Sequence, residues 1–275
     1  MKIGLINTPV PNPLHCKSEI EFTKAFFSLY SEYYFSNIPV NKLANLWQIE
    51  YINQGLLYLA SRLADFRYEI AYYSYANKPS SKTTKELNFG HFVDQIKKEI
   101  DQLDIICIYC ITCNFYLANL IAKEIKKAKS NIIIGLGGPH ATAIPLEILK
   151  HYPVFDFIGI GEGEDSLVEF ITLFNNNKLL TPVAGIAINR NGNTKLEANR
   201  KRIKRLNYRI PDYSISGAKS LPAARIFPNR GCDNKCAFCA DPWRAKVTSI
   251  SLDKVIEEIP EPIVADTAPE DATVN

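Results

Sequence analysis

Five short apolar runs alternate with helix-like segments over roughly the first 175 residues, and this alternation constrains the fold more than any other feature. The third run, 104–111, is continuously apolar, which is typical of a strand buried on both faces of a sheet. Short parallel strands need crossover connections, which are right-handed and usually helical. The pattern therefore predicts an α/β fold with a doubly wound, mainly parallel sheet. The expected strands lie at 2–7, 69–75, 104–111, 131–136 and 155–160, and the expected helices at 55–66, 92–103, 114–129, 145–150 and 165–174.

Loops of small or polar residues follow the carboxyl ends of four of these strands. In doubly wound sheets, ligands bind outside those ends. Glycines let the backbone approach a bulky ligand closely, and nearby helix amino-termini offer N–H donors. None of the loops matches the G-x-G-x-x-G fingerprint or a P-loop, and Asn114 is expected to cap the helix after the third strand. The candidate binding residues at these ends begin at Thr8, Thr112, Gly137 and Gly161.

Three of the seven cysteines lie close together as Cys232, Cys236 and Cys239, in the pattern C-x-x-x-C-x-x-C. Soft thiolate ligands select iron–sulfur clusters, zinc or copper(I). A closed zinc site or an electron-transfer cluster normally takes four protein ligands, and residues 240–275 contain no further Cys or His. The pattern therefore predicts a metal centre with an open coordination position. Accidental spacing of thiols, or a zinc knuckle that borrows a distant ligand, are the alternatives.

The cysteine pattern, with the aromatic Phe238 just before its last cysteine, resembles the radical S-adenosylmethionine (SAM) enzymes. This resemblance implies that the three cysteines hold three irons of a [4Fe–4S] cluster, and that SAM chelates the fourth iron. The implied chemistry is one-electron cleavage of SAM to a 5′-deoxyadenosyl radical. We assign Phe238 to the cofactor site on the same basis.

Two glycine loops extend the resemblance. The sequence Gly137-Gly138-Pro139-His140-Ala141 is followed about twenty residues later by Gly161-Glu162-Gly163-Glu164, which is similar to the cobalamin-binding domain that precedes the radical SAM domain in one large subgroup. In that subgroup, the loops after strands one, three, four and five surround the corrin and its nucleotide tail. The alternative is that the glycines only form turns. The resemblance gives a cobalamin-binding role to Thr8, Thr112, Gly137, Gly138, Gly161 and Glu162.

Several residues depart from the patterns of cobalamin proteins. The cobalt-ligating D-x-H-x-x-G motif is absent, so His15 is not expected to ligate cobalt. Tyr109 stands where a small serine is common in the subgroup, and a phenol there is expected to narrow the corrin site. His140 is interpreted as a residue that hydrogen-bonds locally. The C-x-x-C formed by Cys110 and Cys113 is interpreted as inert packing in or just after a buried strand, rather than at a helix start.

The chain is predicted to contain a cobalamin-binding-like Rossmann domain at 1–180, a connector at 181–222 and the start of a radical SAM (β/α) barrel at 223–275. An aromatic-rich insertion at 19–47 is interpreted as covering structure. A helix at 252–259 and a second barrel strand at 262–266 are expected after the cysteines. A full barrel takes about 250 residues, so we expect most of it to be missing.

The expected function is that of a cobalamin-dependent radical SAM enzyme, with methyl transfer to an unactivated carbon as the reaction and a small molecule as the substrate. An electron donor such as flavodoxin or ferredoxin is the expected partner. The alternatives are a non-catalytic cobalamin-binding or cluster-bearing module, and an electron carrier with an incomplete cluster site.

Composition excludes several other classes of partner and location. The net charge of +3 is small, so no nucleic-acid partner is expected. No apolar run reaches the roughly 18 to 20 residues of a membrane span, and the first residues show no long apolar stretch or cleavage site, so neither a membrane span nor a signal peptide is expected. Clustered cysteines suit a reducing compartment, which favours the cytoplasm.

Overall fold

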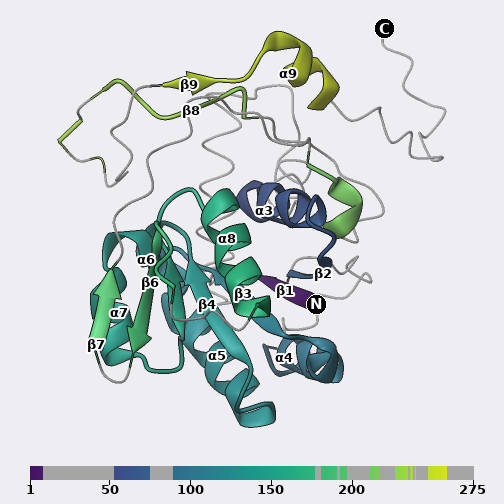
Figure 1. Ribbon diagram of the computed structural model, residues 1–275, viewed down its shortest axis with the longest axis vertical. Coiled ribbons are helices and arrows are strands. Elements are labelled where there is room, and N and C mark those ends of the chain that lie inside the picture. The colour runs from purple at the N-terminus through teal and green to yellow at the C-terminus, as the bar shows by residue number, and fades with distance from the viewer. Residues whose placement is uncertain are drawn as a thin grey trace, which may run out of the picture.

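The computed structural model describes residues 1–8, 53–74, 89–176, 181–190, 193–196, 211–216, 227–234, 236–237, 239 and 247–258 (Figure 1). Four features named above lie outside the described residues: His15, the insertion at 19–47, Phe238 and the strand expected at 262–266.

A seven-stranded sheet forms the centre of the fold, in the order β2-β1-β3-β4-β5-β6-β7. Each of the four pairs that join the first five strands is parallel, which confirms the predicted doubly wound sheet. The chain winds outward in both directions from the β1–β3 pair, because β2 lies on one side of it and β4 and β5 on the other. The strands are β1 (Lys2–Asn7), β2 (Glu69–Ser74), β3 (Ile105–Tyr109), β4 (Ile133–Gly137), β5 (Phe157–Gly159), β6 (Ile186–Arg190) and β7 (Asn193–Leu196).

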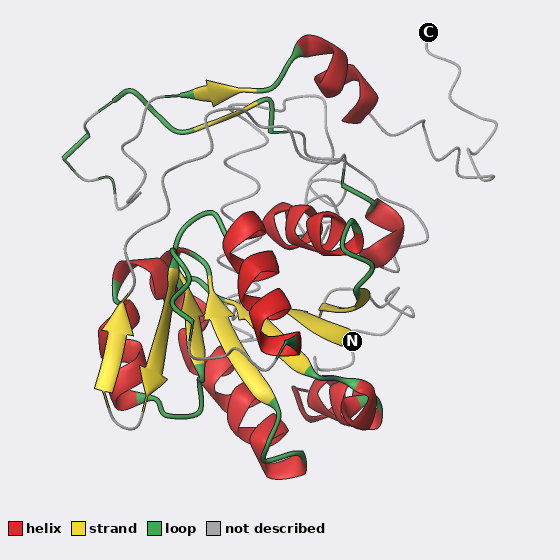
Figure 2. Cartoon of the chain, viewed as in Figure 1, coloured by secondary structure: helices red, strands yellow, loops and turns green. Residues whose placement is uncertain are grey.

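Helices cover both faces of this sheet (Figures 1 and 2). Apolar side chains alternate between the faces, as the two-residue period of a strand requires: Ile105 and Cys107 pack with α3 and α8, whereas Ile106 and Ile108 pack with α4 and α5. The helices are α3 (Gln54–Ala64), α4 (Phe89–Lys98), α5 (Phe115–Ala128), α6 (Pro139–Ala143), α7 (Pro145–His151) and α8 (Glu164–Asn175).

One helix is shifted by several residues from its expected range, and another helix was not expected. The helix expected at 92–103 begins at Phe89 and ends at Lys98, and the 3-10 turn Ile100–Gln102 follows it. This turn keeps Ile100 buried while it redirects the chain into β3. The short helix α6 precedes α7 and was not expected, because its five residues are too few to show a helical period.

The first part of the predicted connector joins the sheet. β6 pairs with β5 and β7 pairs with β6, both antiparallel. Farther along, residues 211–216 pack on α3, where the backbone N–H of Asp212 donates to Ser61 Oγ (3.0 Å) and Gln54 Nε2 donates to the Tyr213 hydroxyl (2.8 Å). These contacts position the chain that leads into the cysteine segment.

The cysteines follow a short strand. β8 (Asn229–Arg230) pairs antiparallel with β9 (Thr248–Ser249), and the helix α9 (Leu252–Glu258) follows, close to the helix expected at 252–259. We use "cysteine loop" for residues 231–239, which leave β8 directly.

Candidate cofactor-binding site

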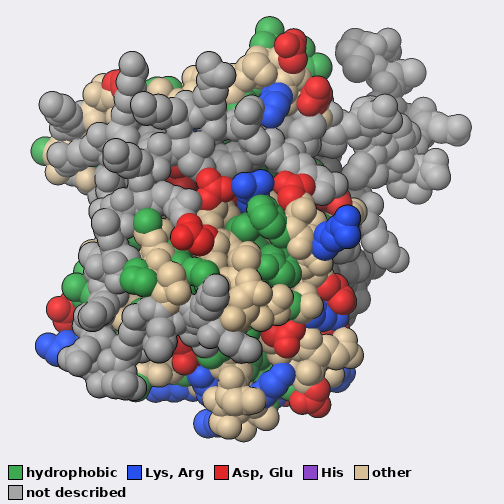
Figure 3. Space-filling model, in the orientation of Figure 1, with side chains coloured by type: hydrophobic (Ala, Val, Ile, Leu, Met, Phe, Trp, Pro, Cys, Tyr) green, Lys and Arg blue, Asp and Glu red, His purple; other side chains and the backbone are tan. Residues whose placement is uncertain are grey.

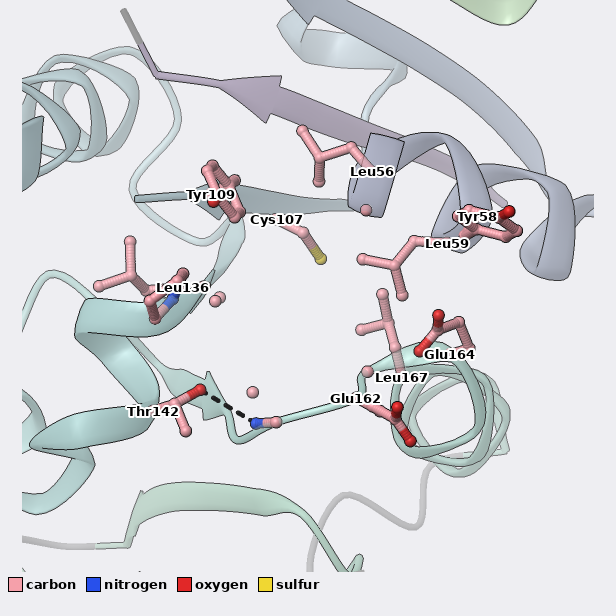
Figure 4. Close-up of a pocket in the computed structure, with 18 of the residues that line it drawn as sticks. Leu56, Tyr58, Leu59, Cys107, Tyr109, Leu136, Thr142, Glu162, Glu164 and Leu167 are labelled. Atoms are coloured by element: carbon pink, nitrogen blue, oxygen red, sulfur yellow. Dashed lines mark hydrogen bonds between the residues drawn. The ribbon is translucent and has the colours of Figure 1, made fainter. Parts of the chain in front are cut away.

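A cavity of about 700 Å³ lies at the carboxyl ends of β3, β4 and β5, between the sheet and the helices α3 and α8. We call it the strand-end cavity. Figure 4 shows that its deep wall is mostly apolar, with Leu56 and Leu59 from α3 and Leu167 from α8 pointing into the space in front of Cys107. Phe227, Asn229, Arg230 and Gly231 close one side, so the start of the cysteine loop is part of the wall.

A glycine at the end of β4 leaves this cavity open. Gly135 and Gly137 occupy the two last positions of β4 that face α3 and α8. A Cβ on Gly135 would lie 2.1 Å from Phe157 Cζ, so this glycine makes room for the phenyl ring. A Cβ on Gly137 would meet nothing within 4 Å, so it would stand in the open space. The second glycine is therefore what leaves the end of the strand open to a ligand.

The next residue, Gly138, requires glycine for conformational reasons. Its φ of 104° lies where L side chains are strained, and a Cβ would lie 2.3 Å from the carbonyl oxygen of Cys110. Thr142 Oγ1 on α6 then accepts a hydrogen bond from the backbone N–H of Gly161 (3.0 Å), as Figure 4 shows. This bond ties the two glycine loops together along one edge of the cavity.

Three charged side chains meet at the rim. Arg230 Nη1 lies 2.7 Å from Glu164 Oε1 and 3.7 Å from Glu162 Oε1, and its guanidinium carbon lies 5.0 Å from the centre of the Tyr58 ring. These ion-pair side chains are mostly buried, with 18% of Arg230, 15% of Glu162 and 5% of Glu164 exposed. Figure 3 shows acidic and basic side chains along the upper rim of the α3 and α8 layer, above apolar ones.

Tyr109 lies on the cavity wall, as its position in the third strand predicts. Its ring lies beside Gly138, where a Cβ would come within 3.0 Å of two ring carbons. Burial raises the pKa of the Tyr109 hydroxyl, and a hydrogen bond with the Asn53 side chain lowers it by less. The phenol therefore remains a neutral donor at physiological pH, and it occupies space that a small side chain would leave open.

Of the six residues predicted to surround cobalamin, Gly137, Gly138, Gly161 and Glu162 line the strand-end cavity, and Thr8 and Thr112 do not. Thr8 is buried at the end of β1, and its carbonyl oxygen accepts a hydrogen bond from Asn114 Nδ2 (3.1 Å). Thr112 Oγ1 lies 3.2 Å from His140 Nδ1. The cofactor roles of all six stay predictions.

Asn114 occupies the N-cap position of α5, as expected, but its side chain makes no capping hydrogen bond to the helix. Its Oδ1 instead accepts a hydrogen bond from the backbone N–H of Ile111 (2.8 Å), while its Nδ2 donates to Thr8. The amide therefore joins the ends of β1 and β3. His140 forms the local hydrogen bond expected of it, and its ring lies 4.6 Å from that of Phe115.

The second cysteine pair differs from the expected inert packing. Cys110 is buried, and burial raises its pKa to about 12. Cys113, however, is exposed and lies in the 3-10 turn Thr112–Asn114, which runs directly into α5. The interpretation was wrong for Cys113, because this turn carries the chain out of the sheet and places the residue at a helix start.

Cys232, Cys236 and Cys239 are all exposed on the cysteine loop. The backbone N–H of Cys239 donates to the carbonyl oxygen of Cys236 (3.1 Å), which folds the last part of the loop back on itself. Within the described part of the chain, no three Cys, His, Asp or Glu side chains converge closely enough to hold a metal ion. Three thiols on one short turn are nonetheless the donor set that an iron–sulfur cluster takes.

Sequence reasoning missed the contributions of the helices and of β8. Leu56 and Leu59 belong to the helix predicted at 55–66 and were not assigned to the site, although they face the cavity. Arg230 and Glu164 were not assigned to the site. The only sequence signal for them was their position, next to the cysteines and in the second glycine loop respectively.

Comparison with known families identifies the domain that contains the cavity. Residues 48–171 match the family described as the B12 binding domain, and the match covers both glycine loops, α3 and most of α8. After this match, we refer to residues 48–171 as the B12-binding domain. The strand-end cavity of this B12-binding domain lies where doubly wound folds bind their ligands.

Two curated relatives are longer than this chain. The chain is 28% identical over 217 residues to an uncharacterized methyltransferase of Pyrococcus horikoshii, covering 74% of this chain and 44% of that protein. It is 26% identical over 158 residues to the cobalamin-dependent radical SAM methyltransferase TokK of Streptomyces tokunonensis, covering 54% of this chain and 23% of TokK. The chain therefore spans less than half the length of either relative.

A solved structure has the same fold. OxsB, a cobalamin-dependent SAM radical enzyme solved with aqua-cobalamin and SAM bound, superimposes with a TM-score of 0.64 at 18% identity. The superposition covers 94% of this chain and 31% of OxsB. The superposition thus covers more of this chain than residues 48–171 alone.

The residues of the cavity fit a cobalamin on structural grounds. Gly137 borders open space that a side chain there would enter, and the mostly apolar wall suits the flat ring of a nucleotide base rather than a bare ion. Among the described residues, no helix is long and apolar enough to cross a membrane.

Proposed function

We propose that this chain binds cobalamin in the strand-end cavity and a [4Fe–4S] cluster on Cys232, Cys236 and Cys239, as part of a radical SAM enzyme that transfers a methyl group to an unactivated carbon. One observation carries the proposal. The wall of the cavity in the B12-binding domain is completed by Phe227, Asn229, Arg230 and Gly231, the residues that lead into the cysteine loop. The two cofactor sites are therefore adjacent.

The residues of the cavity would orient the cofactor rather than react with it. Leu56, Leu59 and Leu167 would exclude water from the nucleotide tail, and Gly137 would let the backbone of β4 approach it. The neutral phenol of Tyr109 would offer a hydrogen-bond donor and a ring face. When bound, cobalamin supplies a transferable methyl group and the cluster with SAM supplies a radical.

The cysteine loop would provide the second site. Its three exposed thiols are accessible to iron, and three ligands leave one iron of a four-iron cluster open. SAM would take that position. The electron would come from a carrier such as flavodoxin or ferredoxin, and exposed thiols suit the reducing cytoplasm. The substrate is a small molecule that the remainder of a barrel would select.

Anaerobic reconstitution tests the proposal. The chain is loaded with ferrous iron and sulfide, mixed with aquacobalamin and separated by gel filtration. We expect about one corrin per chain and a reduced-cluster electron paramagnetic resonance signal that changes when SAM is added. Absence of bound corrin, or a stable zinc complex in place of iron, would contradict the proposal.

The alternative function is a cobalamin-binding module without catalysis. The family match covers residues 48–171 and does not include the cysteine loop, which is the observation that supports this alternative. Bound corrin together with a cluster signal that SAM does not change would support the module. Formation of 5′-deoxyadenosine from SAM under the same conditions would exclude it.

A further inference from the structure

The side chain of Arg230 connects the cysteine segment to the B12-binding domain through an ion pair. It lies in β8, two positions before Cys232, and its Nη1 is 2.7 Å from Glu164 Oε1 in the first turn of α8. Only 5% of the Glu164 side chain is exposed, so the ion pair is largely removed from water. Screening by salt is weak for such a pair.

Two further contacts fix the direction of this guanidinium. Glu162 Oε1 lies 3.7 Å from Nη1, and the Tyr58 ring on α3 stacks 5.0 Å from the guanidinium carbon. A planar guanidinium can donate to carboxylates from its edge while its flat face stacks on an aromatic ring, whereas an ammonium is a compact point charge with no flat face. Arg230 therefore contacts one ring on α3 and two carboxylates of the second glycine loop.

The same four residues line the strand-end cavity: Arg230, Glu162, Glu164 and Tyr58. A ligand that fills the cavity therefore touches the residues that hold Arg230. It also touches Gly231, which directly precedes the first cysteine. A ligand in the cavity and the residue that begins the cysteine loop are therefore both next to the contacts of Arg230.

We propose that Arg230 is a positioning residue that fixes the start of the cysteine loop to the cavity wall, so that cobalamin binding and cluster assembly strengthen each other. This inference rests on the proposed function. Whichever cofactor binds first orders the wall and the loop, and the second then binds without that cost. Coupling of this kind is reciprocal, so each cofactor changes the affinity for the other by the same factor.

The coupling can be measured as a ratio of two dissociation constants. Aquacobalamin is titrated by absorbance into the full chain, once with its cluster reconstituted and once without iron. For the native chain we expect binding about tenfold tighter with the cluster, within the usual range for coupled sites. In Arg230→Met the affinity for aquacobalamin should be the same with and without the cluster, so the ratio should fall to about one. Arg230→Lys should retain part of it, because the charge remains and the fork geometry does not.

Arg62 offers a matched control. Its Nη2 lies 3.1 Å from Asp165 on α8 and its guanidinium carbon lies 5.1 Å from the centre of the Phe66 ring. It thus pairs with a carboxylate of the same helix turn and stacks on an aromatic ring, but both partners belong to the α3–α8 layer. We expect Arg62→Met to keep the native ratio.

Each outcome has a distinct meaning. A native-like ratio in Arg230→Met, or an equal loss in Arg62→Met, overturns the inference. Cobalamin binding by the native chain with a ratio of one also overturns it, while leaving the proposed function intact. No cobalamin binding in either state contradicts the proposed function itself.

A second measurement needs no iron. Alkylation of Cys232 by iodoacetamide is followed by mass spectrometry with and without methylcobalamin, after circular dichroism has shown that each variant is folded. We expect methylcobalamin to slow the reaction several-fold in the native chain and in Arg62→Met, and to leave the rate unchanged in Arg230→Met. Equal protection in Arg230→Met would overturn the inference.

Discussion

Arg230 Nη1 and Glu164 Oε1 lie 2.7 Å apart and join the strand before the cysteines to the first turn of α8. Glu164 is well placed for this role, because a carboxylate at a helix amino-terminus is favoured by the helix dipole. The pair lies on the rim of a cavity in a B12-binding domain. One ion pair thus links the two regions to which we assign the two cofactors.

Replacing Gly137 by Leu should prevent cobalamin binding without unfolding the domain. The side chain would enter open space, since a Cβ there meets nothing within 4 Å, and it would occupy the cavity. We expect the affinity for aquacobalamin to fall by at least about tenfold, which corresponds to about 1.4 kcal/mol, in an absorbance titration.

Ala128→Leu is a suitable control for this substitution. It adds leucine at an exposed position at the end of α5. This variant should bind like the native chain. Unchanged affinity in Gly137→Leu would show that the strand-end cavity does not hold the cofactor.

Replacing Gly135 by Ala should instead destabilise the fold. The new Cβ would lie 2.1 Å from Phe157 Cζ, and Phe157 is itself held 4.3 Å from the ring of Phe170. Overpacking of this kind costs about 1–3 kcal/mol, which urea unfolding would detect.

A second substitution tests whether a steric clash with Phe157 causes the loss of stability in Gly135→Ala. Adding Phe157→Leu should recover part of the stability lost in Gly135→Ala, because the ring that causes the clash is gone. A double-mutant cycle measures this coupling. Strictly additive losses would contradict the explanation.

The six cysteines that the structure describes should fall into two classes by their reactivity toward an alkylating reagent. Burial raises the pKa of both Cys107 and Cys110 to about 12, so both remain neutral thiols at pH 8. Cys113 and the three cysteines of the cysteine loop are exposed. We expect iodoacetamide to label these four in the native chain, and to label Cys107 and Cys110 only after unfolding, as read by peptide mass spectrometry. Early labelling of Cys110 would refute its burial.

The ion pairs of Glu124 predict that the domain loses stability as the pH falls into the acidic range. Hydrogen bonds from Lys127 and Lys97 lower the pKa of Glu124 to about 2, from an ordinary value of 4.5. A carboxylate with a depressed folded-state pKa stabilises the fold above its unfolded pKa and loses this contribution as the pH falls through its folded pKa. Its contribution should therefore be full above about pH 4.5 and disappear as the pH approaches 2.

Urea unfolding of the native chain and of Glu124→Gln between pH 6 and pH 2.5 measures this contribution. The difference between the two should shrink as the pH falls below about 4.5. It should also be smaller at high salt, because the pair is near the surface. A difference that is constant with pH would mean that Glu124 stabilises the fold by packing alone.

Much of the core could be predicted because each strand carries its own signal. The run 104–111 is apolar at nearly every position, and this pattern depends only on burial of both faces. The antiparallel strands β6 and β7 were not expected, since their pairing with β5 depends on contacts distant in the chain. Asn114 shows the same limit, because its bond to Thr8 depends on β1 and β3 being neighbours.

The alternation of the first five strands with helices, the glycine loops at the strand ends and the three cysteines could be predicted from the sequence, because these are local patterns of residue type. The tertiary structure was needed to establish that Gly135 makes room for a ring while Gly137 opens a cavity. It also decided that Leu59 faces that cavity and that Arg230 meets Glu164. These facts depend on which elements are neighbours in space, and packing of the whole chain is what sets that arrangement.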